Sequence, residues 1–305
     1  MIRSFVRGPE AGGNHMITEA EIRQYRRDGF IVVHDLLTRS ELSAIGQVIT
    51  GLVAGAAEVT AHTDIYDLEV GHTRKTPRVR RIKTPHKLHK LFDEVVHMPE
   101  VIRVLQALLG PDIRLHGSKL NMKSAQYGSP VEWHQDWAFY PHTNDELLAI
   151  GVMLDDMALD NGPLLVVPGT HQGPVWNHHG EDGRFCGSID PEQIREEIAH
   201  AVPLTGRAGS MSFHHVRALH GSALNTSDRP RNLLLYEVAA ADAWPLLHFT
   251  ALEEFDSRML AGKSTLTPRL APVPVRMPLP PARHQGSIYE NQRGSARCYF
   301  GKAAA

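Results

Sequence analysis

The chain has 305 residues, of which 42% are hydrophobic and 22% charged, and its formal net charge is −2. This composition is typical of a soluble globular protein with one substantial core or two small ones. The balanced charge gives no reason to expect nucleic acid or a membrane surface as a partner. No apolar run approaches the ~18 residues of a membrane-spanning helix, no secretory signal is visible, and two cysteines are too few for a disulfide framework or a zinc motif.

The N-terminal part is predicted to be mainly helical. Residues 1–16 are rich in glycine and polar residues, so we expect a disordered tail. Thr18 followed by Glu21 is a capping-box pattern, which predicts the start of a helix. The expected elements are a helix from Thr18 to Arg27 that stops at Gly29, a strand at Phe30–Val33, a helix from Thr38 or Ser40 to about Ala57, and a helix at Pro99–Leu109.

Residues 74–90 carry a run of basic side chains. They are Arg74, Lys75, Arg78, Arg80, Arg81, Lys83, Lys87 and Lys90. Such a run usually forms a solvated face. The alternative is an anion site for part of a substrate, to which Arg80, Arg81 and Lys83 would contribute.

From residue 113 onward, short apolar and β-branched runs alternate with Gly, Pro, Asn and Asp turns. The expected strands are Ile113–Met122, Val131–Phe139, Leu147–Leu154, Leu164–Pro168, Gly209–His214 and Asn232–Ala239. A helix is expected at 190–200, and the six prolines of 266–281 indicate an irregular segment. Strands of this length without regular helices between them favour an antiparallel sandwich or barrel. We therefore expect a single domain over 17–305, with a helical part at 17–110, a β core at 111–240 and an irregular segment at 241–305.

The segment Trp133-His134-Gln135-Asp136 is the centre of the functional argument. On a strand, residues i and i+2 point to the same face, so His134 and Asp136 could bind one metal ion together. Two histidines and one carboxylate leave three positions of an octahedron open, as in the facial triad of non-haem iron(II) oxygenases. A second histidine must therefore come from elsewhere in the fold.

The downstream segment that begins at His220 supplies that histidine. Arg231 follows eleven residues later, where a returning strand could bring it to the same pocket. Arginine binds a carboxylate through two parallel charge-assisted hydrogen bonds. This suits the distal carboxylate of 2-oxoglutarate, which Ser222 could share.

These segments closely resemble the phytanoyl-CoA dioxygenase family of iron(II)- and 2-oxoglutarate-dependent enzymes. The resemblance covers about residues 17–240 and rests on the order and spacing of several motifs. They are Asp28-Gly29-Phe30, Trp133-His134-Gln135-Asp136, Asn161-Gly162-Pro163-Leu164, Pro168-Gly169-Thr170-His171 and His220-Gly221-Ser222 with Asn225 and Arg231.

The resemblance implies a mainly β fold with flanking helices around a double-stranded β-helix, a jelly-roll or cupin-like core. It implies His134, Asp136 and His220 as metal ligands, and Arg231 and Ser222 as residues that bind 2-oxoglutarate. Asn121 looks like the family asparagine that approaches the cosubstrate. Related halogenases have a small residue in place of the carboxylate, so Asp136 favours hydroxylation or another oxidation.

Other residues of these segments have more than one interpretation. His171 ends a turn that its ring could fix by hydrogen bonding, which we favour over a ligand role. His214 or His215 could face the pocket beside the ligands. Tyr140 is either a substrate contact or a tyrosine bonded to backbone.

The predicted function is the oxidation, normally hydroxylation, of an unactivated C–H bond of a small-molecule metabolite, with release of succinate and CO2. Fe(II), 2-oxoglutarate and dioxygen are the expected cofactors, and ascorbate should support activity in vitro. We expect a cytoplasmic monomer or homodimer that binds neither nucleic acid nor a membrane. The alternatives are a cupin-like metal enzyme that does not use 2-oxoglutarate and a non-catalytic binding member of the fold.

Overall fold

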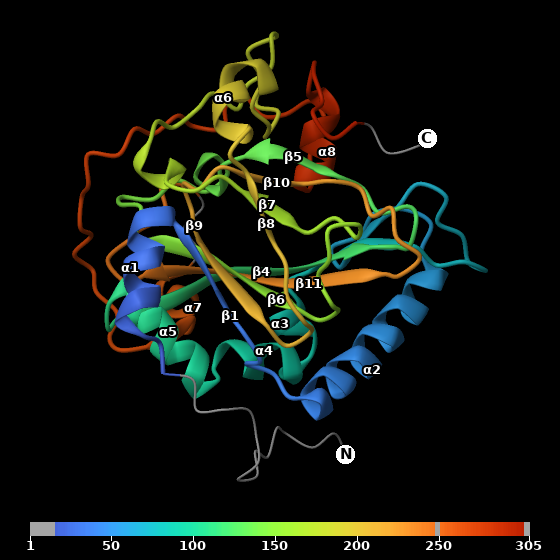
Figure 1. The fold of residues 1–305 in the computed structure, drawn as a ribbon, viewed down its shortest axis with the longest axis horizontal. Helices are drawn as coiled ribbons and strands as arrows, with labels where there is room; N and C mark the ends of the chain where they lie inside the picture. The colour runs from blue at the N-terminus through green and yellow to red at the C-terminus, as the bar shows by residue number, and fades with distance from the viewer. Residues whose placement is uncertain (1–15, 248–250, 302–305) are drawn as a thin grey trace.

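The computed structural model describes residues 16–247 and 251–301, so all of the expected tail at 1–16 except Met16 lies outside the described residues. Two antiparallel sheets face each other, and helices cover the outer side of the larger sheet (Figure 1). The mainly β fold with flanking helices that the sequence predicts is confirmed. The larger sheet consists of β1 (Phe30–Val33), β2 (Tyr66–Leu68), β3 (Val79–Lys83), β4 (Ile113–Lys123), β6 (Leu147–Met153), β9 (Met211–His215), β11 (Arg231–Ala240) and β12 (Met259–Ala261).

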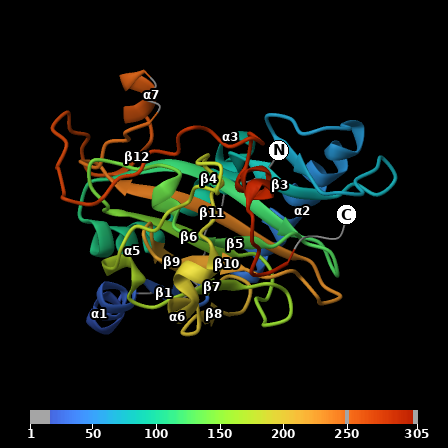
Figure 2. The ribbon, with the colours of Figure 1, turned by 90° about the horizontal axis from the view of Figure 1, so that it is seen from above.

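The smaller sheet has four strands, in the order β5-β10-β7-β8. They are β5 (Val131–His134), β7 (Leu164–Val166), β8 (Val202–Leu204) and β10 (His220–Ser222). The larger sheet has the order β1-β9-β6-β11-β4-β3-β2, with β12 also paired to β4. Its longest strands, β4 and β11, run side by side across the molecule (Figure 2).

The helices are short apart from α1, α2 and α5. The α-helices are α1 (Glu19–Asp28), α2 (Arg39–Gly55), α3 (Pro85–Leu88), α4 (Lys90–Val96), α5 (Pro99–Leu109), α6 (Arg195–Ile198), α7 (Leu252–Asp256) and α8 (Ile288–Asn291). Single 3-10 turns are η1 (Ala56–Glu58), η2 (Asp136–Ala138), η3 (Thr170–Gln172), η4 (Pro191–Ile194) and η5 (Gln292–Gly294).

The ends of the first two helices follow the sequence signals. The Thr18 side chain accepts a hydrogen bond from the Glu21 amide, and Glu21 accepts one from the Thr18 amide, which completes the capping box. Gly29 ends α1 with φ 81°, in the left-handed region that glycine adopts at little cost. Thr38 rather than Ser40 caps α2 in the same way.

Among the described residues, the segment Arg39–Glu58 is long and apolar enough to cross a membrane when judged by length and composition alone. In this fold its residues Ile45 and Ile49 are buried in the main hydrophobic cluster instead. A helix that packs one apolar stripe on a sheet passes the same test of composition.

The alternation of side chains along each strand gives the larger sheet two different faces. Leu120 of β4 lies opposite Leu234 of β11, and both belong to the apolar cluster that α4 and α5 cover. Their neighbours Lys119, Asn121 and Arg231 point to the other face, toward the smaller sheet. The main hydrophobic cluster thus lies between the larger sheet and the helices, whereas the polar cavity lies between the two sheets.

Two parts of the fold differ from the sequence interpretation. The strand expected at 131–139 is too long, because β5 ends at His134 and the chain turns into η2 at Asp136. The Trp137 amide donates to the Val216 carbonyl, 3.0 Å away, which draws this turn out of the smaller sheet. Residues 17–110 also provide β2 and β3 to the larger sheet, and 241–305 contains β12, α7 and α8 beside its irregular stretches.

Candidate metal centre

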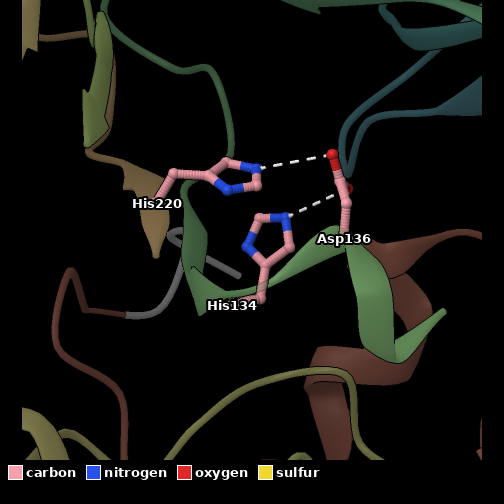
Figure 3. Close-up of side chains that lie close together, drawn as sticks. All are labelled: His134, Asp136 and His220. Atoms are coloured by element: carbon pink, nitrogen blue, oxygen red, sulfur yellow. Dashed lines mark ion pairs between the residues drawn. The ribbon is translucent and has the colours of Figure 1, made fainter. Parts of the chain in front are cut away.

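Two histidines lie side by side on adjacent strands of the smaller sheet. His134 at the end of β5 is the direct cross-strand partner of His220 at the start of β10, and their ring centroids are 4.1 Å apart. Asp136 reaches the same point from η2, with its carboxylate oxygens 3.8 Å from His134 Nε2 and 3.9 Å from His220 Nε2 (Figure 3). The three possible ligand atoms all lie within 4.8 Å of one another, which is a spacing that one metal ion can bridge.

The orientation of both imidazole rings is fixed by backbone carbonyls. His134 Nδ1 lies 2.8 Å from the Glu132 carbonyl oxygen, and His220 Nδ1 lies 2.9 Å from that of Ala218. A carbonyl only accepts, so each Nδ1 carries the proton and each Nε2 presents its lone pair toward Asp136. Metal-binding histidines are held in this way in proteins.

The protonation of the three groups suits a cation. Burial lowers the pKa of His220 to about 4 and, with the neighbouring His220 ring, lowers the pKa of His134 well below its ordinary value. Burial would raise the pKa of Asp136, but Lys119 and the neighbouring His214 outweigh it and hold that pKa well below the usual range. Two neutral imidazoles and one carboxylate are therefore available near neutral pH.

A cavity of about 50 Å³ adjoins these residues between the two sheets. Arg231 lines it from β11, is only 2% exposed, and donates from Nη2 to the Gly162 carbonyl oxygen, 2.7 Å away. Burial lowers its pKa to about 10, so the guanidinium stays charged at neutral pH. Among the described residues, no carboxylate lies within ion-pair distance of Arg231, and its Nε has no hydrogen-bond partner. A buried cation without a counter-ion is costly, which fits a site that receives an anion.

Ser222 lines the same cavity from β10. Its Oγ lies 3.0 Å from the ammonium nitrogen of Lys123, a buried lysine on β4. Burial and the nearby Arg231 lower the pKa of Lys123 well below its ordinary value. Arg231 and Ser222 thus line the same cavity.

Asn121 also lines the cavity, as the sequence interpretation requires, but its amide oxygen accepts a hydrogen bond from Arg81 Nε at 2.9 Å. Arg81 comes from β3, where it is the cross-strand partner of Asn121. The other basic residue of the lining, Lys119, lies 2.7 Å from a carboxylate oxygen of Glu237. The cavity is thus lined by three basic side chains and one acidic one, Asp136.

Most of the basic run at 74–90 has a structural partner. Lys83 pairs with Asp67 at 3.0 Å, Arg80 pairs with Glu290, and the exposed Arg74 pairs with Glu58 at 2.8 Å. Of the three residues considered for an anion site, only Arg81 lines the metal cavity. The interpretation as a solvated face therefore holds for part of the run only.

The remaining candidate residues have mixed positions. His171 Nε2 lies 3.2 Å from the Arg26 carbonyl oxygen, outside the cavity, in the structural role that the sequence favours. His214 is buried in the cavity wall with Nε2 3.7 Å from Asp136, whereas His215 packs against His171 with ring centroids 5.2 Å apart. Tyr140 does not line the cavity; burial and Asp136 raise its pKa.

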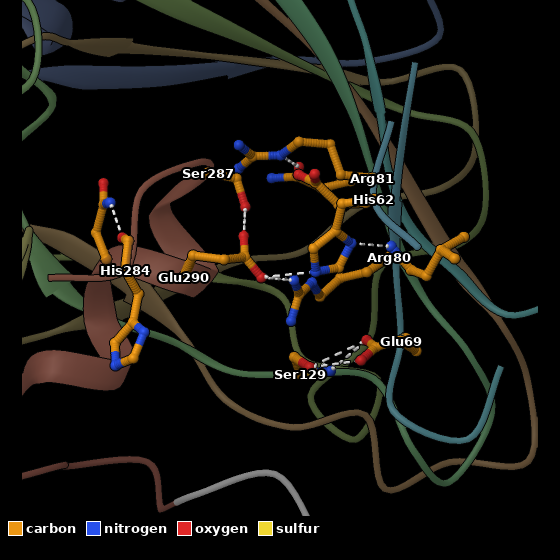
Figure 4. A network of polar contacts seen from close by, with 12 residues as sticks. His62, Glu69, Arg80, Arg81, Ser129, His284, Ser287 and Glu290 are labelled. Carbon is orange, nitrogen blue, oxygen red and sulfur yellow. Dashed lines mark hydrogen bonds and ion pairs between the residues drawn. The ribbon is translucent and has the colours of Figure 1, made fainter. Parts of the chain in front are cut away.

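Sequence reasoning missed the C-terminal wall of the site. Ile288 and Tyr289 of α8 line the metal cavity, and Tyr289 also lines a larger pocket of about 710 Å³ on its other side. The pattern Ser287-x-x-Glu290 is a helix-start signal that could have located this helix. In the structure, Ser287 Oγ donates to the Glu290 carboxylate at 2.5 Å (Figure 4).

Comparison with known proteins gives the same picture of the fold. The profile of the phytanoyl-CoA dioxygenase (PhyH) family matches residues 25–233. The probable alpha-ketoglutarate-dependent hypophosphite dioxygenase of Stutzerimonas stutzeri is 37% identical over 281 residues, covering 91% of this chain and 98% of that protein. The L-proline trans-4-hydroxylase of Streptomyces griseoviridis is 28% identical, covering 72% of this chain and 85% of that protein.

Among solved structures, EctD from S. alaskensis with 2-oxoglutarate and 5-hydroxyectoine matches with a TM-score of 0.65 at 24% identity. The match covers 88% of this chain and 90% of that one. The fold is therefore the jelly-roll type that the sequence predicts.

Proposed function

The chain belongs to the phytanoyl-CoA dioxygenase family, and on that premise we propose that His134, Asp136 and His220 bind its catalytic ferrous ion. The protein is a 2-oxoglutarate-dependent non-haem iron dioxygenase that acts on a small molecule, with Fe(II), 2-oxoglutarate and dioxygen as its cofactors. This assignment replaces the alternatives of a metal enzyme without 2-oxoglutarate and of a non-catalytic binding protein.

The convergence of three buried ligand groups on one point carries the proposal. Nitrogen and carboxylate donors suit Fe(II), and three protein ligands leave three adjacent positions for cosubstrate and dioxygen. The backbone carbonyls behind both rings hold the Nε2 atoms in place before any metal arrives. When bound, iron with 2-oxoglutarate and dioxygen supplies the oxidising power, and the overall reaction releases succinate and CO2.

We assign the distal carboxylate of 2-oxoglutarate to Arg231, with Ser222 and Asn121 as further contacts. The buried guanidinium has no carboxylate partner in the described parts of the chain, which supports this role, because a carboxylate would both neutralise it and accept its free donors. Lys123 donates to Ser222, which leaves the Ser222 hydroxyl hydrogen available for a carboxylate oxygen.

The protein residues place the substrate and exclude water. His214 Nε2 lies 3.7 Å from Asp136 Oδ2 and limits the rotation of the carboxylate. Tyr289 and Ile288 close the cavity on the C-terminal side, so that the oxidised bond lies away from bulk solvent.

We also propose that residues 17–305 form one domain, with the metal between its two sheets. A cytoplasmic monomer or homodimer without nucleic-acid or membrane partners fits the balanced charge and the burial of the apolar face of α2 in the core.

The experiment that tests the proposal compares His220→Ala with the wild-type protein. Removing one of three ligands should lower iron affinity by more than about 100-fold, since even residues behind the ligands affect affinity by 10–100-fold. Iron content after anaerobic loading and succinate formation from 2-oxoglutarate are the two measurements.

His200→Ala is the matched control, because His200 is an exposed histidine outside the cavity. It should bind iron and form succinate as the wild-type protein does. Equal iron content and succinate formation in His220→Ala would contradict the ligand assignment.

A further inference from the structure

Arg81 is a basic residue of the metal cavity that the proposed function leaves without a role. It is 8% exposed, and its Nε donates to Asn121 at 2.9 Å. Its guanidinium carbon lies 5.2 Å from the centroid of the Tyr289 ring, so one face of the group is covered. The two remaining nitrogens can donate to a ligand without moving the group.

The charges around Arg81 are balanced without it. Lys83 pairs with Asp67, the cross-strand partner of Arg81, and Lys119 pairs with Glu237. Arg80, next in sequence, pairs with Glu290 (Figure 4). Within the described part of the chain, Arg81 itself has no carboxylate within ion-pair distance.

The proposed cofactors do not neutralise the positive charge of Arg81. The formal charge of a ferrous ion is balanced by the dianion of 2-oxoglutarate. The positive charge of Arg231 is balanced by the negative charge of Asp136. Lys123 is not part of the cavity lining, and its ammonium group donates to the Ser222 hydroxyl behind it. One positive charge therefore remains in the cavity, on Arg81.

We propose that Arg81 binds the negative charge of the substrate, and that the substrate is a small monoanion such as a phosphorus oxyanion or a short carboxylate. This inference rests on the proposed function, because the balance of charge includes iron and 2-oxoglutarate. A monoanion would accept two charge-assisted hydrogen bonds from the guanidinium and neutralise the cavity. Ile288 and Tyr289 wall the cavity beside Arg81, so a short anion fits this site better than a long acyl chain.

The alternative role for Arg81 is contact with 2-oxoglutarate, because the strand of Asn121, β4, lies between the strands of Arg81 and Arg231. The two roles differ in which affinity the residue controls. A substrate contact affects binding of the anion alone, whereas a cosubstrate contact affects binding of 2-oxoglutarate.

The test is calorimetric titration of hypophosphite into anaerobic protein loaded with Fe(II) and 2-oxoglutarate. We expect the wild-type protein to bind it, Arg81→Met to bind it at least about tenfold more weakly, and Arg81→Lys to lie between. Arg74→Met removes one positive charge from the same basic run and should bind hypophosphite and 2-oxoglutarate normally, since Arg74 is exposed and paired with Glu58. L-Proline, a zwitterion without net charge, should bind more weakly than hypophosphite.

Three results would overturn the Arg81 assignment. They are unchanged hypophosphite affinity in both folded Arg81 variants, weaker binding of 2-oxoglutarate in place of hypophosphite, and a wild-type preference for L-proline. The same titration with metal-free protein separates this inference from the proposed function. If metal-free protein binds hypophosphite and the binding depends on Arg81, the subsite is supported even when the iron analysis contradicts the proposed ligands. If neither the metal-free nor the loaded protein binds hypophosphite, the subsite is refuted.

Discussion

The two faces of the larger sheet have opposite chemistry, although they alternate residue by residue along the same strands. On β11, Leu234 and Tyr236 are fully buried against the helices, whereas Arg231 and Leu235 face the cavity. On β4, Leu120 belongs to the apolar core and its neighbours Lys119 and Asn121 to the polar interior of the sandwich.

This difference separates stability from chemistry within single strands. The helix-covered face supplies the apolar burial that stabilises the fold. The other face holds cations that are costly to bury, and we propose that they bind anions. Substitutions on one face should therefore affect unfolding, and substitutions on the other should affect ligands.

The largest expected effect comes from the metal centre. Asp136→Ala should abolish substrate-stimulated succinate formation, because the site loses its only carboxylate ligand and most of its iron affinity. Its melting temperature without metal should fall below that of the wild-type protein, since Lys119 and His214 lose the carboxylate that compensates their charge. Calorimetry measures the melting temperature, and a succinate assay measures turnover. Turnover at the wild-type rate would contradict the assignment of Asp136 to the metal centre.

A matched pair on β11 tests the two faces directly. Leu234→Ala should reduce the free energy of unfolding by about 2–5 kcal/mol, as expected for a leucine fully buried in a core. Leu235→Ala, at the next position, should reduce the free energy of unfolding by less, because the cavity beside Leu235 already lacks close packing. It should also change the affinity for the substrate. Urea unfolding and substrate titration give both values, and the reverse pattern would refute the division.

The next test removes the positively charged side chain that is proposed to bind 2-oxoglutarate. Arg231→Met should weaken 2-oxoglutarate binding by about 10–100-fold, because one or two charge-assisted hydrogen bonds are lost. Iron content should stay unchanged, since Arg231 is not among the proposed ligands. Anaerobic titration of 2-oxoglutarate gives its affinity; normal affinity would exclude Arg231 from the cosubstrate site.

The smallest effect concerns a buried histidine behind the metal centre. His178 Nε2 accepts a hydrogen bond from the Gln135 amide at 2.9 Å, and burial lowers its pKa to about 4. Because the folded pKa lies below the unfolded value, the unfolded chain takes up the proton first as pH falls. The contribution of His178 to the free energy of unfolding should be complete above about pH 6.5 and fall by about 2 kcal/mol by pH 5.

Urea unfolding at pH 7 and pH 5 measures this dependence on metal-free protein. His178→Gln cannot titrate in this range and should show a weaker dependence on pH, with lower stability at pH 7. An equal pH dependence in both proteins would assign the effect to other groups.

The sequence predicts the long strands well, because their alternation persists over many residues. The expected strand Asn232–Ala239 corresponds to β11 at Arg231–Ala240, and Leu147–Leu154 to β6 at Leu147–Met153. Three-residue strands such as β2, β8 and β10 carry too few residues for a period to show. They form because their neighbours in the sheet supply the hydrogen bonds.

The ligand set could be proposed from spacing and family resemblance, but its geometry could not. Asp136 reaches His134 from a 3-10 turn, not from a continuous strand, and the direct pairing of His134 with His220 depends on the register of β5 and β10. The roles of Arg81 and Tyr289 depend on contacts between residues about 200 positions apart, which no local pattern encodes.

A crystal structure of the anaerobic protein with Fe(II) and 2-oxoglutarate tests the central claim most directly. It should show one iron ion bound by Nε2 of His134, Nε2 of His220 and one oxygen of Asp136, with 2-oxoglutarate on the cavity side and its far carboxylate at Arg231. Iron bound elsewhere, or 2-oxoglutarate out of reach of Arg231, would contradict this account of the site.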